Sequence, residues 1–150
     1  MIEATMDGST MRPLPEHGRI FELSMRPLLA DCAPSGRMRM DALARWLQDV
    51  AFTDIEDAGV NDAAIWVLRR TRIQVHRFPR FGERCDLLTF CSGYGRMWAE
   101  RRTSIVPAGG GPALVEGQAL WVHLDPETRR PCSPASPNPA RCSSTGQAPD

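Results

Sequence analysis

The stretch IWVLRRTRIQVHRFPRFGERCDLLTFCSGYGRMWAERR, residues 65–102, decides the fold of this 150-residue chain. Its first part alternates between two kinds of side chain, as a half-buried strand does. One side of that alternation holds Ile65, Val67, Thr71, Ile73 and Val75. RFPRFG, residues 77–82, ends the strand because a proline removes a ladder donor, and a second strand then turns through Gly93-Tyr94-Gly95 into a third. The stretch therefore predicts consecutive antiparallel strands.

One amphipathic helix precedes these strands, in DALARWLQDVAFTDIEDAG, residues 41–59. Asp41 is a good N-cap residue, and Gly59 follows the last periodic position as a C-terminal stop. The helix carries an apolar stripe, made of Leu43, Trp46, Leu47, Val50, Ala51, Ile55 and Ala58. At about 1.5 Å per residue it is about 26 Å long, enough to lie across a whole sheet. The acids near its end are expected on the surface. They are Asp54, Glu56 and Asp57.

The order of elements predicts an α+β domain. A strand in RIFELSMRPL, residues 19–28, precedes the helix, and ALVEGQALWVHLD, residues 113–125, closes the sheet. The length suits one domain, which we place at residues 19–131. Residues 1–18 are polar and are expected to be flexible. Residues 132–150 contain no large apolar residue and are rich in Pro, Ser and Ala, so we expect a disordered tail.

The charge of the chain is unevenly distributed. All 18 basic residues are arginine, and 18 acids bring the formal net charge to zero. Nine arginines nevertheless lie between Arg69 and Arg102, against three acids. Such a surplus favours an anionic partner, although solvent-facing arginines can also simply keep a sheet soluble. The neutral total and the lack of a basic recognition helix argue against a nucleic-acid partner.

Several other classes find no support in the sequence. The five cysteines include no CxxC pair and the three histidines are scattered, so no metal site is predicted. No apolar run approaches eighteen residues, and MIEATMDGST lacks the features of a signal peptide. We therefore expect a cytoplasmic protein without a membrane span.

Four segments together resemble the first domain of the acyl-acyl carrier protein thioesterases of plants and bacteria. They are the helix ALARWLQDVAFTDIEDAG, the break RFPRFG, the turn and strand GRMWAERR, and the closing WVHLDPETRRP. The resemblance covers about residues 20–131. It implies a hot-dog fold, in which a curved antiparallel sheet wraps around a long central helix, and an enzyme of fatty acid biosynthesis that needs no cofactor.

The resemblance also implies a partner and a binding surface. Such enzymes receive a fatty acyl thioester from an acyl carrier protein, which is strongly acidic. Arg77, Arg80 and Arg84 flank the loop most able to protrude, and we predict that they orient this carrier protein. The helix and sheet of such a domain also line the acyl tunnel. The candidate lining residues here are Leu43, Trp46, Leu47, Val50, Trp66, Leu68 and Trp98, each of which can equally be core.

The chain departs from the family where the catalytic groups would follow, in a second hot-dog domain with an N-x-H motif. No N-x-H occurs in the 150 residues, and a truncation or frameshift of a two-domain protein would give such a tail. The loop DCAPSGRMRM, residues 31–40, is similar to the D-x-D-x-x-G-H-V loop of single-domain hot-dog thioesterases, but Ala33 and Arg37 replace its second acid and its histidine. Asp31, Gln48 and Asp49 are the candidate catalytic residues.

Three functions remain open at this point. The first is an acyl carrier protein thioesterase that works as a homo-oligomer, since the second domain normally covers one edge and face of the sheet. The second is a non-catalytic half that binds an acyl group or its carrier protein. The third is a hot-dog acyl-CoA hydrolase or dehydratase, and the lack of a histidine between His17 and His76 counts against the dehydratase.

Overall fold

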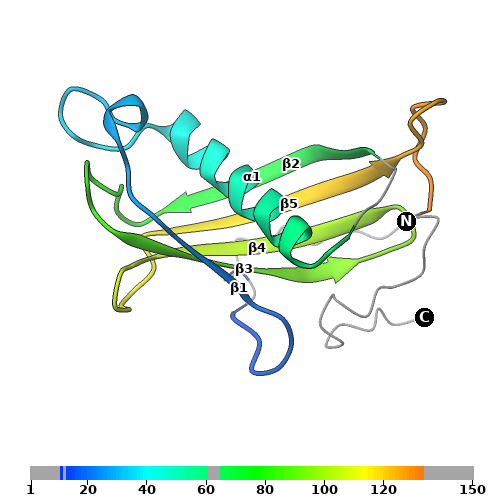
Figure 1. The fold of residues 1–150 in the computed structure, drawn as a ribbon, viewed down its shortest axis with the longest axis horizontal. Helices are drawn as coiled ribbons and strands as arrows, with labels where there is room; N and C mark the ends of the chain where they lie inside the picture. Colours follow the sequence, from blue (N-terminus) through cyan, green and yellow to red (C-terminus); the bar gives the residue numbers. More distant parts are fainter. Residues whose placement is uncertain (1–10, 12, 61–64, 134–150) are drawn as a thin grey trace.

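The computed structural model describes residue 11, residues 13–60 and residues 65–133. Within them, one α-helix and one short 3₁₀ helix accompany a five-stranded antiparallel sheet (Figure 1). The elements are β1 (Phe21–Met25), η1 (Leu29–Asp31), α1 (Met40–Asp57), β2 (Ile65–Val75), β3 (Cys85–Tyr94), β4 (Trp98–Pro107) and β5 (Val115–Leu124). The α+β prediction is confirmed. The flexible start predicted for residues 1–18 lies outside the described residues except for residues 11 and 13–18, and the disordered tail predicted for residues 132–150 lies outside them except for residues 132 and 133.

The sheet has the strand order β1-β3-β4-β5-β2, so the two strands that flank the helix in sequence lie at opposite edges. All four neighbouring pairs are antiparallel. Helix α1 lies across one face of the curved sheet (Figure 1). This is the hot-dog arrangement that the resemblance implies, and we call the face that α1 covers the inner face.

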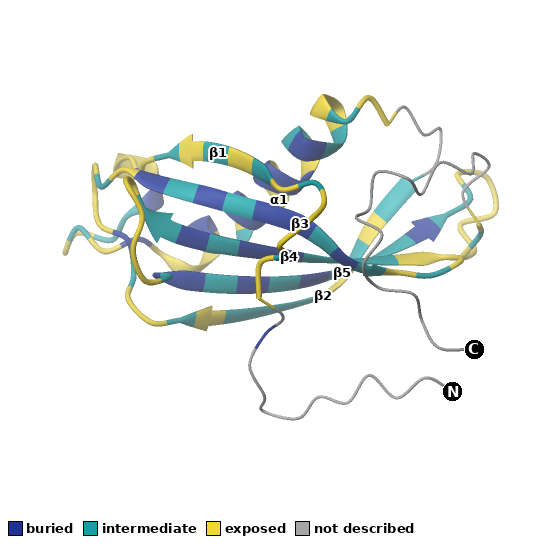
Figure 2. Cartoon of the chain, turned by 90° about the horizontal axis from the view of Figure 1, so that it is seen from below, coloured by how far each residue is buried: buried dark blue, intermediate teal, exposed yellow. Residues whose placement is uncertain are grey.

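The core forms between α1 and the inner face. Leu43, Trp46 and Val50 of the helix are at most 1% exposed. They belong to one cluster with Cys85 and Leu87 of β3 and with residues of β4 and β5. Burial alternates accordingly along the first half of β3 and of β5 (Figure 2). Burial also raises the pKa of the Cys85 thiol to about 11.

The ends of α1 follow the predicted signals with one correction. The helix begins at Met40 and its N-cap residue is Arg39, so Asp41 is not the N-cap but lies in the first turn. At the other end Gly59 adopts φ +66, and the N–H of Val60 donates to the carbonyl of Ile55 at 3.2 Å. A left-handed residue at this position is what glycine supplies at low cost.

A bulge in β2 changes which residues face the helix. The register with β5 shifts between Leu68 and Arg70, so the alternation reverses there. Trp66 and Leu68 therefore share the inner face with Thr71, whereas Val67 lies on the other side. The sequence pattern, read without this bulge, wrongly placed Ile65 and Val67 on the same side as Thr71, Ile73 and Val75.

Candidate functional site

The inner face beneath α1 carries most of the residues predicted to line an acyl tunnel. Leu43, Trp46, Leu47 and Val50 are all buried there, with at most 5% of each exposed. Leu47 lies directly over β5, where a Cβ on Gly117 would stand 2.7 Å from its Cδ1. The helix thus sits close to the sheet because Gly117 has no side chain.

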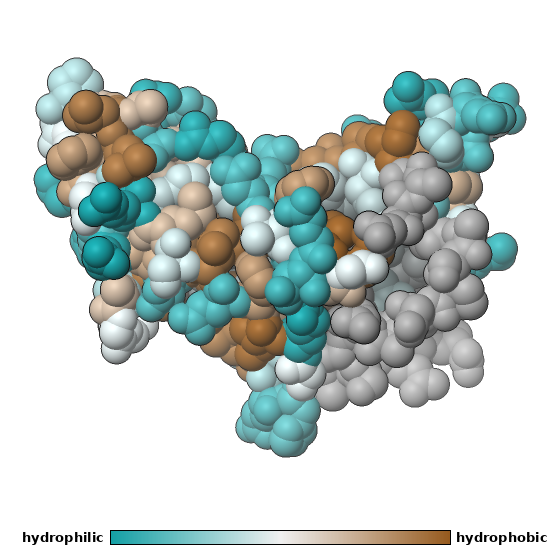
Figure 3. Space-filling model, viewed as in Figure 1, coloured by the Kyte–Doolittle hydropathy of each residue, from teal (hydrophilic) through white to brown (hydrophobic). Residues whose placement is uncertain are grey.

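The inner face continues beyond α1 along β2 and β5. Trp66 and Leu68 are half-buried here, and the Trp66 ring meets the buried His123 ring edge-on, with centroids 5.0 Å apart. Two polar atoms on this part of the face, Thr71 Oγ1 and Trp121 Nε1, are buried without a hydrogen-bond partner. Figure 3 shows hydrophobic residues in the hollow between α1 and this end of β2 and β5.

Trp98 does not belong to this face. The unbroken register of β4 with β5 puts Trp98 on the same side as Arg102, opposite the side that holds Ile105 of the core. Its indole lies over the β3–β4 turn, where a Cβ on Gly95 would come within 2.3 Å of Nε1. The prediction that Trp98 lines the helix–sheet region is therefore wrong on position.

Asp31 and Asp49 are brought to one guanidinium. Asp31 is 6% exposed, and its Oδ1 accepts a hydrogen bond from Arg45. Its Oδ2 accepts the backbone N–H of Leu28 at 2.9 Å. Asp49 is half-exposed and lies 3.8 Å from Arg45. Both oxygens of Asp31 are thus engaged, whereas Asp49 keeps access to solvent.

Gln48 lies apart from this pair of acids. It is exposed, and its side-chain nitrogen reaches only the carbonyl of Ala44, at 3.5 Å. Among the three catalytic candidates, only Asp31 and Asp49 are linked through a common residue.

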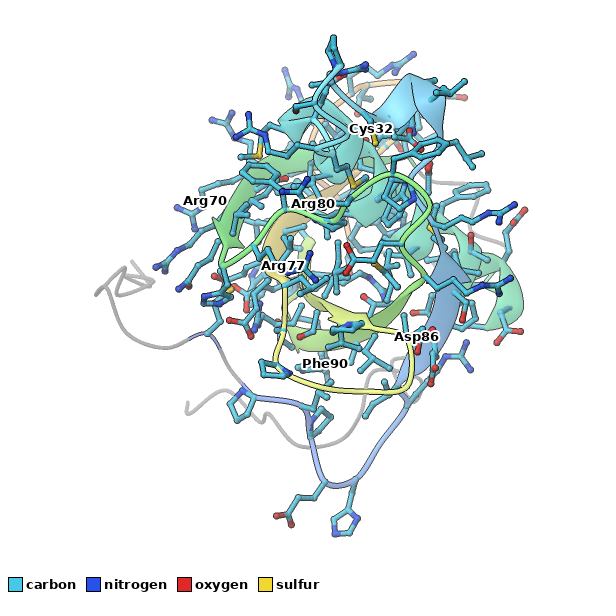
Figure 4. All side chains as sticks on the ribbon, turned by 90° about the vertical axis from the view of Figure 1, so that its left-hand side faces the viewer. Cys32, Arg70, Arg77, Arg80, Asp86 and Phe90 are labelled. Carbon is cyan, nitrogen blue, oxygen red and sulfur yellow. The ribbon has the colours of Figure 1, made fainter. Side chains whose placement is uncertain are left out.

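The three arginines predicted to bind a carrier protein lie on one loop at the end of the molecule where α1 begins. Arg77 is paired with Glu83 at 2.5 and 3.1 Å, which lowers the pKa of that carboxyl. The exposed Arg80 and Arg84 form no ion pair with any residue in the described ranges. Figure 4 shows this end of the molecule from outside, with Arg77 and Arg80 in front of the sheet.

The loop is fixed to the segment that leads into α1. The N–H of Met38 donates to the carbonyl of Pro79 at 2.9 Å, and that of Phe81 donates to Gly36 at 2.8 Å. The Arg37 guanidinium also stacks 4.6 Å above the Phe78 ring. The helix start and the arginine loop therefore form one surface.

A buried charged cluster was missed by sequence reasoning. Asp54, expected on the surface, is only 6% exposed. It accepts hydrogen bonds from Arg19 at 2.7 and 3.0 Å and from Arg101 at 2.5 Å. Arg101 also donates to Thr89 at 3.3 Å. The signal was present, because Asp54 follows Leu47 by seven residues and Val50 by four, which puts it on the apolar stripe.

The described residues contain no group of three side chains suited to hold a metal ion. None of their helices has the length and hydrophobicity needed to cross a membrane.

Comparison with known proteins identifies the family to which the chain is similar. The sequence profile of the acyl-ACP thioesterase N-terminal domain, where ACP is acyl carrier protein, matches residues 18–136. The chloroplastic oleoyl-acyl carrier protein thioesterase 2 of Arabidopsis thaliana is 22% identical over 103 residues, which are 61% of this chain and 28% of the plant protein.

Two solved structures share the fold. An acyl-ACP thioesterase from Bacteroides thetaiotaomicron superimposes with a TM-score of 0.70 at 21% identity, over 75% of this chain and 49% of the other. A DHNA-CoA thioesterase from Staphylococcus aureus gives 0.69 at 14% identity, over 76% and 80%. The chain thus spans about half or less of the acyl-ACP thioesterases it matches, but 80% of the DHNA-CoA thioesterase.

Proposed function

Because the chain belongs to the acyl-ACP thioesterase family through the N-terminal domain of these enzymes, we propose that it binds fatty acyl groups carried as thioesters on an acyl carrier protein and takes part in their hydrolysis. The observation that carries this proposal is the match of residues 18–136 on a helix-and-sheet domain of the expected topology. Its setting would be fatty acid biosynthesis in the cytoplasm, without a cofactor.

The inner face suits an alkyl chain. We place the chain between α1 and the β2–β5 end of the sheet, against Leu47, Trp66 and Leu68, with Leu43, Trp46 and Val50 beneath it as core. Each CH₂ removed from water contributes about 0.8 kcal/mol, so a long chain would bind strongly on such a surface. The unpartnered Thr71 Oγ1 and Trp121 Nε1 leave donors there for a polar atom of the ligand or for water.

The arginine loop suits the carrier protein. Arg80 and Arg84 are exposed, and Arg77 retains about half of its side-chain exposure while it is paired with Glu83. Exposed arginines speed the encounter with an acidic partner in a salt-dependent way. In this arrangement the thioester would arrive at the start of α1, whose first N–H groups and positive dipole favour a developing oxyanion.

Within the described residues, no single copy of the domain places a free carboxylate where the catalytic base is needed. Hydrolysis requires a group that takes a proton from the attacking water within hydrogen-bond reach of the thioester. Asp31 lies near the helix start, but both of its oxygens are engaged. The Asp49 carboxylate is accessible to solvent, but it follows Met40 by nine residues. It therefore lies about 13 Å along the helix from the start of α1, where the thioester would arrive. We therefore propose that Asp31 positions Arg45, and that Asp49 would serve a thioester presented by a second hot-dog unit.

That second unit could be another copy of this chain. Strand β2 lies at an edge of the sheet formed by the described residues and includes the exposed Val67. An exposed edge of this length favours pairing with a further strand. We propose a homodimer in which each copy completes the site of the other.

A non-catalytic acyl-binding half is the second candidate, and the engagement of both Asp31 oxygens favours it. Release of thiol from palmitoyl-acyl carrier protein tests the two functions, with the Asp31→Ala, Asp49→Ala double variant and the Gln48→Ala variant alongside. Turnover that the double variant loses supports hydrolysis. Carrier-protein binding without turnover supports the binding half, and the absence of both refutes the proposal.

A further inference from the structure

Three large apolar side chains are exposed together at the end of the molecule where α1 begins. Leu28 is 53% exposed, Leu29 is 81% exposed and Phe81 is 52% exposed. The N–H of Gly82 donates to the carbonyl of Pro27 at 2.8 Å, so the two segments that carry these side chains are directly joined. We call these three residues the apolar tip. Figure 3 shows hydrophobic residues on the projecting corner over the segment between β1 and α1.

Arginines surround the apolar tip. Arg26 precedes Pro27 in sequence, Arg80 precedes Phe81, and Arg37 and Arg80 face each other across an isolated β-bridge. All three arginines are exposed, and none forms an ion pair with another described residue.

Three of the acids at this end are already neutralised by arginines, whereas Asp86, at the start of β3, accepts a hydrogen bond from Ser24 at 2.6 Å and forms no ion pair with a described residue. Asp31 is paired with Arg45, Asp41 with Arg39 at 2.9 Å, and Glu83 with Arg77. Arg26, Arg37 and Arg80 outnumber this one acid, so the balance of unpaired charge around the tip is positive.

We propose that the apolar tip and its arginines dock this protein on an anionic lipid surface. Leucine and phenylalanine side chains that project from the fold can enter the headgroup region, where arginines pair with lipid phosphates. Basic residues next to such a membrane-facing segment add attraction to anionic lipid.

The bound orientation follows from the geometry. The membrane would lie against the end of the molecule that holds the start of α1 and the loop of Arg77 and Arg80 (Figure 4). Arg80 also belongs to the set proposed for the carrier protein, so lipid and carrier protein would compete for it. Lipid docking itself does not depend on the proposed hydrolysis.

Co-sedimentation with vesicles tests the inference, using phosphatidylcholine alone and phosphatidylcholine mixed with phosphatidylglycerol. We expect the protein to pellet with the mixed vesicles and to be released by high salt. Leu29→Glu with Phe81→Glu, and separately Arg37→Gln with Arg80→Gln, should each weaken binding about tenfold or more. Phe52→Glu is the matched control, since Phe52 is 63% exposed on α1 and should leave binding unchanged.

Three outcomes would overturn the inference. The first is equal binding by the tip variants and the wild type. The second is self-association that Leu29→Glu abolishes, without vesicle binding, which would make the tip an interface between copies. The third is carrier-protein binding that needs the tip, again without vesicle binding. All the altered side chains are exposed, so unchanged melting temperatures would show that the variants remain folded.

Discussion

The burial of Asp54 could not be predicted by inspecting the sequence around it. The spacing of Asp54 from Leu47 and Val50 puts it on the apolar stripe of α1, but a carboxylate near a helix end normally faces water. The structure buries it because two arginines from distant segments, Arg19 and Arg101, satisfy both oxygens. Neither partner lies within a helical turn of Asp54 in sequence, so no local pattern could have predicted the cluster.

Removing the Asp54 carboxylate should therefore be costly. Asp54→Ala leaves the guanidinium of Arg101, whose side chain is 14% exposed, without its acid. We expect a loss of roughly 3–5 kcal/mol in the free energy of unfolding, measured by urea denaturation. Asp57→Ala is the control, since the Asp57 side chain is 57% exposed and Arg19 is its one ion-pair partner among the described residues. Similar losses in the two variants would contradict the central role of Asp54.

The Glu83 carboxyl should give the stability a pH dependence. Its hydrogen bond with Arg77 lowers its pKa from the usual 4.5, so its contribution is present above that value and is lost as the pH falls through the lower folded pKa. Because both side chains are partly exposed, the expected contribution is about 1 kcal/mol or less. Glu83→Gln should be less stable than the wild type at pH 7, and the difference should vanish in acid. A difference that persists in acid would contradict this assignment.

At the scale of elements, the contact between α1 and β5 rests on a glycine. Gly117→Ala would put a methyl group 2.7 Å from Leu47, and overpacking of this kind costs about 1–3 kcal/mol. Gly93→Ala is the matched control in the same sheet, where the new Cβ would meet only ordinary contacts at 3.5 Å or more. Thermal unfolding of the two variants measures the difference in stability. Adding Leu47→Val to Gly117→Ala should restore part of the loss, because the shorter side chain relieves the clash. Equal melting temperatures for Gly117→Ala and Gly93→Ala would contradict it.

The elements themselves were largely predictable, and the reason is periodicity. The apolar stripe of α1 repeats every three or four residues over four turns, and Gly59 marks its end. The bulge in β2 was not predictable, since residues 68–70 carry no glycine or proline to mark an extra residue. That single irregularity moved Val67 away from the inner face, and the strand register likewise removed Trp98 from the predicted lining set.

At the scale of the whole molecule, the sequence indicated the family but could not predict which distant residues lie in contact at the candidate site. Asp31 and Asp49 are 18 positions apart, and only the packing of η1 against α1 shows that Arg45 joins them. Arg77, Arg80 and Arg84 were placed on one loop from the RFPRFG break, but their attachment to the helix start depends on backbone hydrogen bonds between distant segments.

Self-association should depend on the edge formed by β2. Sedimentation velocity of the wild type is expected to show a dimer, and Val67→Glu should shift it to monomer without unfolding it, since Val67 is already 39% exposed. Val60→Glu is the control, because Val60 is similarly exposed but lies outside the strand. A wild type that remains monomeric at high concentration would refute the proposed dimer.

Cys85 gives the fold its own reporter of motion. The thiol is fully buried beneath α1, and with a pKa of about 11 it is almost entirely protonated at neutral pH. The thiolate is the nucleophile that reacts with an alkylating reagent, so Cys85 should be labelled only during excursions in which the helix leaves the sheet. The partly exposed Cys32 supplies an internal reference on the same molecule. The ratio of the two labelling rates can be followed by mass spectrometry as an acyl thioester is added. A rise in the rate for Cys85 relative to Cys32 would show that α1 must separate from the sheet before the acyl group can enter.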